Sequence, residues 1–260
     1  KNMIIGAQMY TLREFCKTTQ DLEISLTRVA EMGYTAVQLS GVCEYDPAWM
    51  RDTLKKLGLV APVTHVAAEK LQNDLPAVIA AHDVTGIPYI GLGSAPHCFD
   101  KEKNALLAFD EALTWLPQTA KAIAAAGHRF LYHNHNREYA KNAAGKNFFE
   151  RLAEVLTPAE CGFLADTYWC QMGGDDPAAF LLRYRDRVPC IHFKDFAFDP
   201  AEHAPHMAPV GEGNLNWERI FAAAKEAGVE YAFVEQDKCY GEDPFDCLKR
   251  SLAFCRSAGL

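Results

Sequence analysis

Short apolar stretches alternate with longer amphipathic stretches along the whole chain, and this alternation limits the folds available to it. The apolar stretches predict strands at residues 4–10, 35–39, 59–66, 89–92, 130–139, 161–166, 189–194 and 231–235. A stretch with helical spacing follows each strand, and many of these helices end at a glycine, a common helix stop. Strands that alternate with helices form parallel sheets with the helices outside.

Eight strand–helix units in 260 residues match a (β/α)₈ TIM barrel, a fold whose usual length is about 250 residues. We therefore predict a single barrel domain over residues 1–260. The alternative is a doubly wound open sheet, which needs a glycine-rich phosphate turn after its first strand. Residues 11–16 read TLREFC and contain no glycine. The prediction includes one long helix at 104–126, bent at Pro117, and a rim loop at 196–216 that is a candidate lid.

Ionisable residues end four consecutive predicted strands: His133, Asp166, His192 and Glu235. The carboxyl ends of TIM-barrel strands meet at one face, so these side chains are expected to converge. Two imidazoles and two carboxylates are suitable ligands for a divalent metal ion. Burying them together without a cation would be costly. The pattern thus predicts a metal site at the top of the barrel.

Other polar residues are expected at the same face. Residues two apart on a strand share a side, so His135 faces the same way as His133, while Gln38 and His65 point inward from the second and third strands. Lys194 is a candidate substrate-orienting cation, an electrostatic catalyst, or simply the partner of Asp195. Further candidates are Glu212 in the rim loop, for which a solvated turn is the alternative, and four rim aromatics, Tyr10, Phe15, Trp169 and Trp217. His82 and His128 are expected at the surface.

Charge and cysteine content limit the partners. The formal net charge is -8 and no basic run occurs, which argues against nucleic acid or an anionic membrane as a partner. The nine cysteines show no paired spacing, which predicts free thiols in a reducing compartment. No apolar run is long enough to cross a bilayer and no signal peptide is recognisable. We expect a cytoplasmic protein and leave open whether it is a homo-oligomer.

Six motifs resemble the sugar phosphate isomerase/epimerase group of xylose isomerase-like TIM barrels, which also includes endonuclease-IV-like and inosose-dehydratase-like proteins. The motifs are IGAQMYTLR, YHNHNREY, ADTYW, IHFKD, VGEGNLNW and VEQD, and they extend over essentially the whole chain. The resemblance implies metal ligands at the tops of strands five to eight, typically Glu, Asp, His and Glu. By position these are His133, Asp166, His192 and Glu235, and His133 stands where many relatives have glutamate.

The resemblance implies an isomerase or epimerase that acts on a sugar, sugar phosphate or polyol with Mn²⁺ or Mg²⁺, or alternatively Zn²⁺ or Co²⁺. A proton next to a carbonyl would be removed by Glu235, with an enediolate as the intermediate. His135 or His65 would provide the second acid–base group, and Lys194 would stabilise the negative charge. His65, Trp169, Gln38 and Glu212 are the expected substrate contacts. The alternatives are a lyase that dehydrates an inosose or keto-sugar, a metal-dependent nuclease, and a sugar-binding barrel without catalysis.

Overall fold

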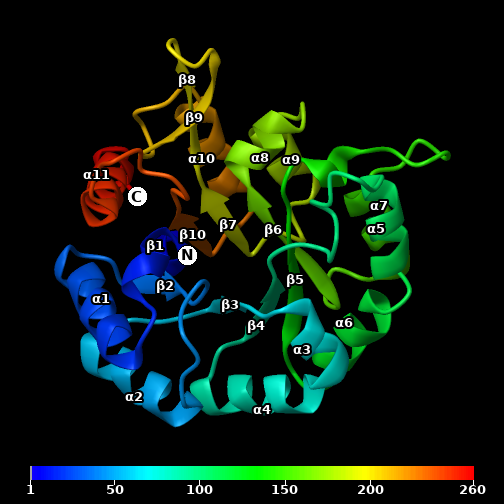
Figure 1. Cartoon of the computed structure of the whole chain (residues 1–260), viewed down its shortest axis with the longest axis horizontal. Coiled ribbons are helices and arrows are strands. Elements are labelled where there is room, and N and C mark those ends of the chain that lie inside the picture. Colours follow the sequence, from blue (N-terminus) through cyan, green and yellow to red (C-terminus); the bar gives the residue numbers. More distant parts are fainter. Residues whose placement is uncertain (1) are drawn as a thin grey trace.

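The computed structural model describes residues 2–260, and its central feature is a sheet of eight parallel strands inside a ring of helices (Figure 1). The strands run in the order β2-β1-β10-β7-β6-β5-β4-β3. Their bounds are β1 (Ile4–Gln8), β2 (Ala36–Gln38), β3 (Val63–His65), β4 (Tyr89–Leu92), β5 (Arg129–His133), β6 (Cys161–Asp166), β7 (Cys190–Phe193) and β10 (Tyr231–Val234). The predicted TIM barrel is confirmed.

The helices surround the sheet, and most of them lie between consecutive strands. They are α1 (Thr19–Glu31), α2 (Pro47–Leu57), α3 (Ala68–Asn73), α4 (Leu75–Thr85), α5 (Ala105–Ala112), α6 (Leu116–Ala125), α7 (Phe148–Val155), α8 (Thr167–Met172), α9 (Pro177–Arg183), α10 (Trp217–Glu226) and α11 (Pro244–Ser257). Two short 3₁₀ turns, η1 (Met9–Phe15) and η2 (Arg137–Tyr139), follow β1 and β5. No helix among residues 2–260 is long and apolar enough to cross a membrane.

The barrel closes between β2 and β3 through isolated bridges instead of a continuous ladder. The amide of Val37 donates to the carbonyl of Val60, and the amide of His65 donates to Leu39. Residues 59–66 were predicted as one strand, but β3 begins only at Val63. Pro62 interrupts the stretch, because proline has no N–H to donate to a ladder.

The barrel interior is filled from below by one buried apolar residue on each of six strands. These residues are Ala36, Val63, Leu131, Leu164, Cys190 and Phe233. Two positions further along each strand stands a polar residue that points to the same side: Gln38, His65, His133, Asp166, His192 and Glu235. This spacing places the polar set at the top of the barrel. The larger apolar cluster packs the outer faces of the strands against the helices.

Three further predicted elements differ from the structure. The strand expected at 130–139 ends at His133, and the 3₁₀ turn η2 follows it. The helix expected at 104–126 is two helices, α5 and α6, and the chain breaks before Pro117, which fits the first turn of α6. The expected rim loop at 196–216 contains an antiparallel hairpin, β8 (Asp195–Asp199) and β9 (Ala204–Ala208), which projects from the barrel in Figure 1. Only the segment after β9 remains irregular.

The Asp195 carboxylate fastens this irregular segment to the end of β7. Asp195 is fully buried and accepts hydrogen bonds from the backbone amides of Gly211 and Gly213, at 2.8 and 3.0 Å, and from the indole N–H of Trp217, at 2.8 Å. A Cβ atom on Gly213 would lie 2.4 Å from the Asp195 carboxylate, so only glycine permits this approach. The IHFKD and VGEGNLNW motifs therefore contact each other through Asp195.

Candidate metal and active site

A cavity of about 630 Å³ opens at the carboxyl ends of the barrel strands. Its volume is in the range of small-molecule sites. Five of the predicted site residues line it: His65, His133, His135, Lys194 and Glu235. The ends of β3, β5, β7 and β10, with the residues just after them, therefore bring these side chains to one chamber, as the sequence pattern predicted.

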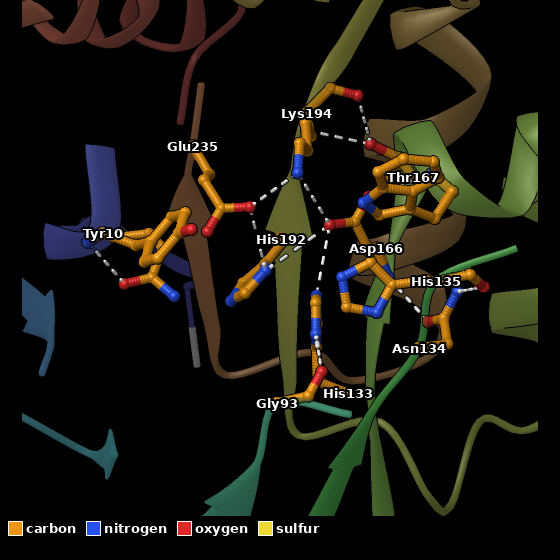
Figure 2. A network of polar contacts seen from close by, with 12 residues as sticks. Tyr10, Gly93, His133, Asn134, His135, Asp166, Thr167, His192, Lys194 and Glu235 are labelled. Carbon is orange, nitrogen blue, oxygen red and sulfur yellow. Dashed lines mark hydrogen bonds and ion pairs between the residues drawn. The ribbon is translucent and has the colours of Figure 1, made fainter. Parts of the chain in front are cut away.

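Three predicted metal ligands form a compact group, and one of them, His133, also lines this cavity. One ligand atom each from His133, Asp166 and His192 lies within 4.8 Å of the others, and all three side chains are buried. The Oδ2 atom of Asp166 lies 3.2 Å from His133 Nε2 and 3.6 Å from His192 Nδ1. Glu235 joins at the edge, with its Oε1 atom 3.7 Å from His192 Nδ1 (Figure 2).

The second nitrogen of each imidazole is held by a neighbouring acceptor. His192 Nε2 donates to the side-chain oxygen of Gln38 at 2.5 Å, and His133 Nδ1 donates to the carbonyl of Gly93 at 2.8 Å. These bonds leave His192 Nδ1 and His133 Nε2 to face Asp166, which is how metal-binding histidines are usually oriented. His192 Nδ1 is buried without a hydrogen-bond partner among residues 2–260. The residues present therefore fit a divalent metal ion.

Asp166 and its neighbours are fixed by the start of α8. The Oδ1 atom of Asp166 accepts from the amide of Trp169 at 3.0 Å and so caps this helix, which leaves Oδ2 directed at the imidazoles. The amide of Asp166 donates to the Asn134 side chain at 3.0 Å. Thr167 exchanges two hydrogen bonds with the backbone of Lys194, at 2.8 and 2.9 Å. The ADTYW motif thus holds β5, β6 and β7 in register at their ends.

Lys194 is buried among three carboxylates. Its ammonium nitrogen lies 2.8 Å from Asp237, 3.0 Å from Glu235 and 3.7 Å from Asp166. Although burial opposes the charged form, Glu235 and Asp166 raise the pKa of Lys194 above its ordinary value. Burial and the charge of Glu235 raise the pKa of Asp237 to about 6. Burial also disfavours charge on Asp166, but Lys194 and the imidazoles hold the pKa of that carboxyl well below its usual range.

The pKa values of the site histidines shift in two directions. Burial opposes protonation of His133, yet the adjacent Asp166 carboxylate raises its pKa. Burial and the charge of His133 lower the pKa of His192 to about 4 and that of His135 to about 2. Burial also lowers the pKa of His65, whose Nδ1 atom lies 3.1 Å from the Ser40 hydroxyl. His65, His135 and His192 are therefore neutral near pH 7.

Three expected substrate contacts are placed differently by the structure. Gln38 is fully buried under His192 and orients that ring, so it is not on the cavity wall. Glu212 is half exposed and pairs with Arg250, with both carboxylate oxygens 2.9 Å from the guanidinium. Trp169 packs on His135 with ring centroids 5.3 Å apart, and so stands one side chain behind the cavity. The predicted contact of Glu212 with the site is wrong, because Arg250 draws its side chain to the helix surface.

The predicted rim aromatics also differ in where they lie. Tyr10 lines the cavity, whereas Phe15 packs on Phe245 and Trp217 is buried beside Phe193. Phe99 lines the cavity and was not anticipated, since the loop after β4 carries no strand pattern that would assign its direction. Its ring stands edge-on to His135 at 4.6 Å.

The two histidines expected at the surface are largely buried. His82 is 6% exposed, and its ring bonds Thr64 Oγ1 and the Val78 carbonyl, each at 2.7 Å. His128 has a side chain that is 8% exposed and pairs with Asp83 at 2.7 Å. This prediction is wrong because α4 turns the face that carries His82 toward the barrel.

Comparison with known proteins identifies the family. The model of the xylose isomerase-like TIM barrel family matches residues 26–258. The chain belongs to this family. Its residues 2–260 also superpose closely on a solved sugar phosphate isomerase/epimerase from Parabacteroides distasonis ATCC 8503, with a TM-score of 0.79 and 21% identity, covering 99% of this chain and 95% of that one.

Two further relatives bear on the chemistry. An inosose dehydratase of Lacticaseibacillus casei is 26% identical over 148 residues, which is 52% of this chain and 47% of that protein. The chain thus spans about half the length of that curated relative. The IOLI protein, whose crystal structure contains a bound zinc atom, superposes with a TM-score of 0.72 at 12% identity and covers 98% of this chain and 97% of that one. The first of these two proteins is thus named as a dehydratase, and the second binds zinc.

Proposed function

We propose that this protein is a divalent-metal-dependent enzyme that removes a proton next to the carbonyl of a sugar or polyol, with isomerisation or epimerisation as the outcome. His133, Asp166, His192 and Glu235 would hold the ion. When bound, the ion would supply a Lewis acid that polarises the carbonyl and acidifies the adjacent C–H bond. Two imidazoles in the ligand set favour Mn²⁺, Zn²⁺ or Co²⁺ over Mg²⁺, which prefers oxygen ligands.

The observation that carries the proposal is the asymmetric environment of Glu235. Its Oε1 atom is held by Lys194 at 3.0 Å and approaches His192, while the side chain also lines the cavity. The second carboxylate oxygen is therefore available to take a proton from a substrate in the chamber. Lys194 lies where it would stabilise the negative charge of an enediolate.

A second proton-carrying group is needed on the other face of the substrate for epimerisation. Figure 2 places Glu235 on one side of the His192 and Lys194 side chains and His135 on the other. We assign His135 as the group opposite Glu235. His65 is the alternative, because it also lines the cavity and its Nε2 atom has no hydrogen-bond partner within residues 2–260.

The second candidate reaction is dehydration, and it is supported by the similarity to inosose dehydratase. Removal of the same proton would be followed by loss of a β-hydroxyl group as water. The imidazole of His135 or His65 would then assist the departing hydroxyl. We further expect the enzyme to act in the cytoplasm, which agrees with nine free cysteines.

Metal analysis followed by solvent-deuterium exchange tests the proposal. The purified protein is expected to bind about one divalent ion per chain and to incorporate deuterium into a ketose, inosose or 3-keto sugar in D₂O. Incorporation without loss of water identifies isomerisation or epimerisation, whereas product two hydrogens and one oxygen lighter identifies dehydration. Absence of both ion binding and exchange across the panel would contradict the proposal.

A further inference from the structure

A second chamber of about 410 Å³ adjoins the candidate active site above the seam between β2 and β3. Five residues line both chambers and mark where the two chambers meet: Ser40, Gly41, His65, Val66 and Ala67. The outer wall is formed by the loop after β2 and by α4. A molecule held beside His65 therefore has space on both sides of that residue.

The second chamber is lined mainly by apolar side chains. They include Leu39, Val42, Tyr45, Val66, Val78 and Ala81. The polar groups at its floor already bond one another, since Thr64 Oγ1 and His82 Nε2 are 2.7 Å apart and Ser40 Oγ lies 3.1 Å from His65 Nδ1. A ligand in this chamber would thus meet more apolar than polar surface.

The charges of the second chamber oppose an anion. Its titratable lining includes the carboxylates of Glu44 and Asp74 and a single ammonium, Lys70. Lys70 already pairs with Glu44 at 3.2 Å. A phosphate group would therefore meet net negative charge without an unpaired cation.

We propose, on the basis of the function proposed above, that the substrate is a sugar or polyol that carries an uncharged, apolar, ring-sized substituent. The polar part would occupy the chamber beside Glu235 and Lys194. The substituent would pass His65 and pack in the second chamber on Tyr45 and Val78. Because the two chambers share five lining residues, the simplest occupant is one molecule that spans both. A volume of about 410 Å³ exceeds what a hydroxyl substituent can fill, so the substituent is expected to be larger.

Binding of matched sugars to the Mn²⁺-loaded protein tests this proposal. The probes are D-glucose, D-galactose, D-mannose and D-xylose, their phenyl β-glycosides and their 1-phosphates, with Kd measured by titration calorimetry. Burial of a phenyl ring is expected to lower Kd at least about tenfold for one or more of the four sugars. A phosphate at the same position is expected to give no such gain.

A matched pair of variants on α4 locates the effect. Ala81→Phe fills the second chamber and is expected to remove the gain of the phenyl group, whereas Ala80→Phe, at an exposed position of the same helix, is expected to keep it. Ala77→Phe, at the exposed end of the chamber wall, replaces Ala81→Phe if that variant does not fold. The proposal is overturned if no phenyl glycoside binds more tightly than its parent sugar, or if the gain survives the chamber-filling variant.

The same measurements keep this proposal separate from the proposed function. A phenyl gain that disappears in Ala81→Phe, in a protein that exchanges no proton with any sugar, would support the second chamber and contradict the enzymatic proposal. Proton exchange with the parent sugars and no gain in affinity from the phenyl group would support the enzymatic proposal and contradict the second chamber.

Discussion

The ammonium nitrogen of Lys194 lies 3.0 Å from the Oε1 atom of Glu235. The same ammonium is 3.7 Å from Asp166 Oδ2, and both carboxylate oxygens also approach His192 Nδ1, at 3.7 and 3.6 Å respectively. Lys194 thus places a positive charge beside Glu235 and Asp166, as a metal ion bound by these two residues would. The lysine and the ion are expected to oppose each other in binding, although both would favour negative charge on a substrate.

Replacing Lys194 by methionine is therefore expected to tighten metal binding. Removal of one like charge a few ångströms from the ion should lower the Kd for Mn²⁺ or Zn²⁺ at least about tenfold. The same variant should lose about 10²-fold or more in proton exchange, because it lacks the cation beside the developing charge. Chelator competition and deuterium exchange measure the two effects, and Lys194→Arg is the charge-retaining control. Unchanged or weaker metal binding by folded Lys194→Met would show that the ammonium does not oppose the ion.

Glu235 and Asp166 are expected to respond differently to neutralisation. Asp166 lies at the centre of the ligand group, so Asp166→Asn should abolish most metal binding. Glu235 lies at its edge, so Glu235→Gln should retain more metal yet lose about 10²–10⁴-fold in proton exchange. Metal content per chain and deuterium incorporation are measured on both proteins. Near wild-type exchange by Glu235→Gln would make Glu235 a ligand only and direct the search for the base to His65, His133 and His135.

Asp195 is predicted to be one of the most important polar residues for stability. Its buried carboxylate accepts from the amides of Gly211 and Gly213 and from the Trp217 indole, so Asp195→Asn sets an amide N–H₂ group against donors. We expect a loss of about 2–4 kcal/mol in the free energy of unfolding. Glu212→Gln, which removes only a partly exposed pair with Arg250, should cost less than about 1 kcal/mol. Urea unfolding measures both, and equal losses would contradict the assigned role of Asp195.

The sequence predicted the placement of side chains well where strand geometry alone sets their direction. His133, Asp166, His192 and Glu235 were assigned by their positions at strand ends, and the two-residue period leaves no other direction for them once the barrel closes. Glu212 has no such constraint: its direction depends on Arg250, 38 residues away on a different element. Loop residues such as Phe99 and long-range pairs therefore needed the structure.

Gln38 and His82 illustrate a second limit of the sequence. Both were recognised as polar residues, but their roles depend on partners far along the chain, since Gln38 bonds His192 at 2.5 Å and His82 bonds Thr64 at 2.7 Å. Apolar residues lie on nearly all sides of α4, so the sequence did not indicate which face of the helix carries His82. Short helices such as α3 and α8 were missed because six residues carry too little periodicity.

His82 is expected to make the protein less stable in mild acid. Burial, with a further contribution from His128, lowers the pKa of His82 below its ordinary value, although its bond to the Val78 carbonyl acts the other way. The unfolded chain therefore takes up a proton at this histidine when pH falls through about 6.5, while the folded protein does so only at a lower pH. The stability contributed by neutral His82 is present above that pH and is lost as pH falls, with a slope of at most about 1.4 kcal/mol per pH unit.

His82→Gln isolates this contribution. The variant should be less stable at pH 8, because it loses ring contacts and the bond to Thr64, yet its unfolding free energy should fall less steeply than wild type between pH 7 and 5. The measurement is urea unfolding of metal-free protein in chelator, so that metal binding does not add its own pH dependence. His203→Gln, at an exposed position, is the control and should follow the wild-type slope. Parallel wild-type and His82→Gln profiles would mean that His82 takes up its proton in the folded protein as readily as in the unfolded chain.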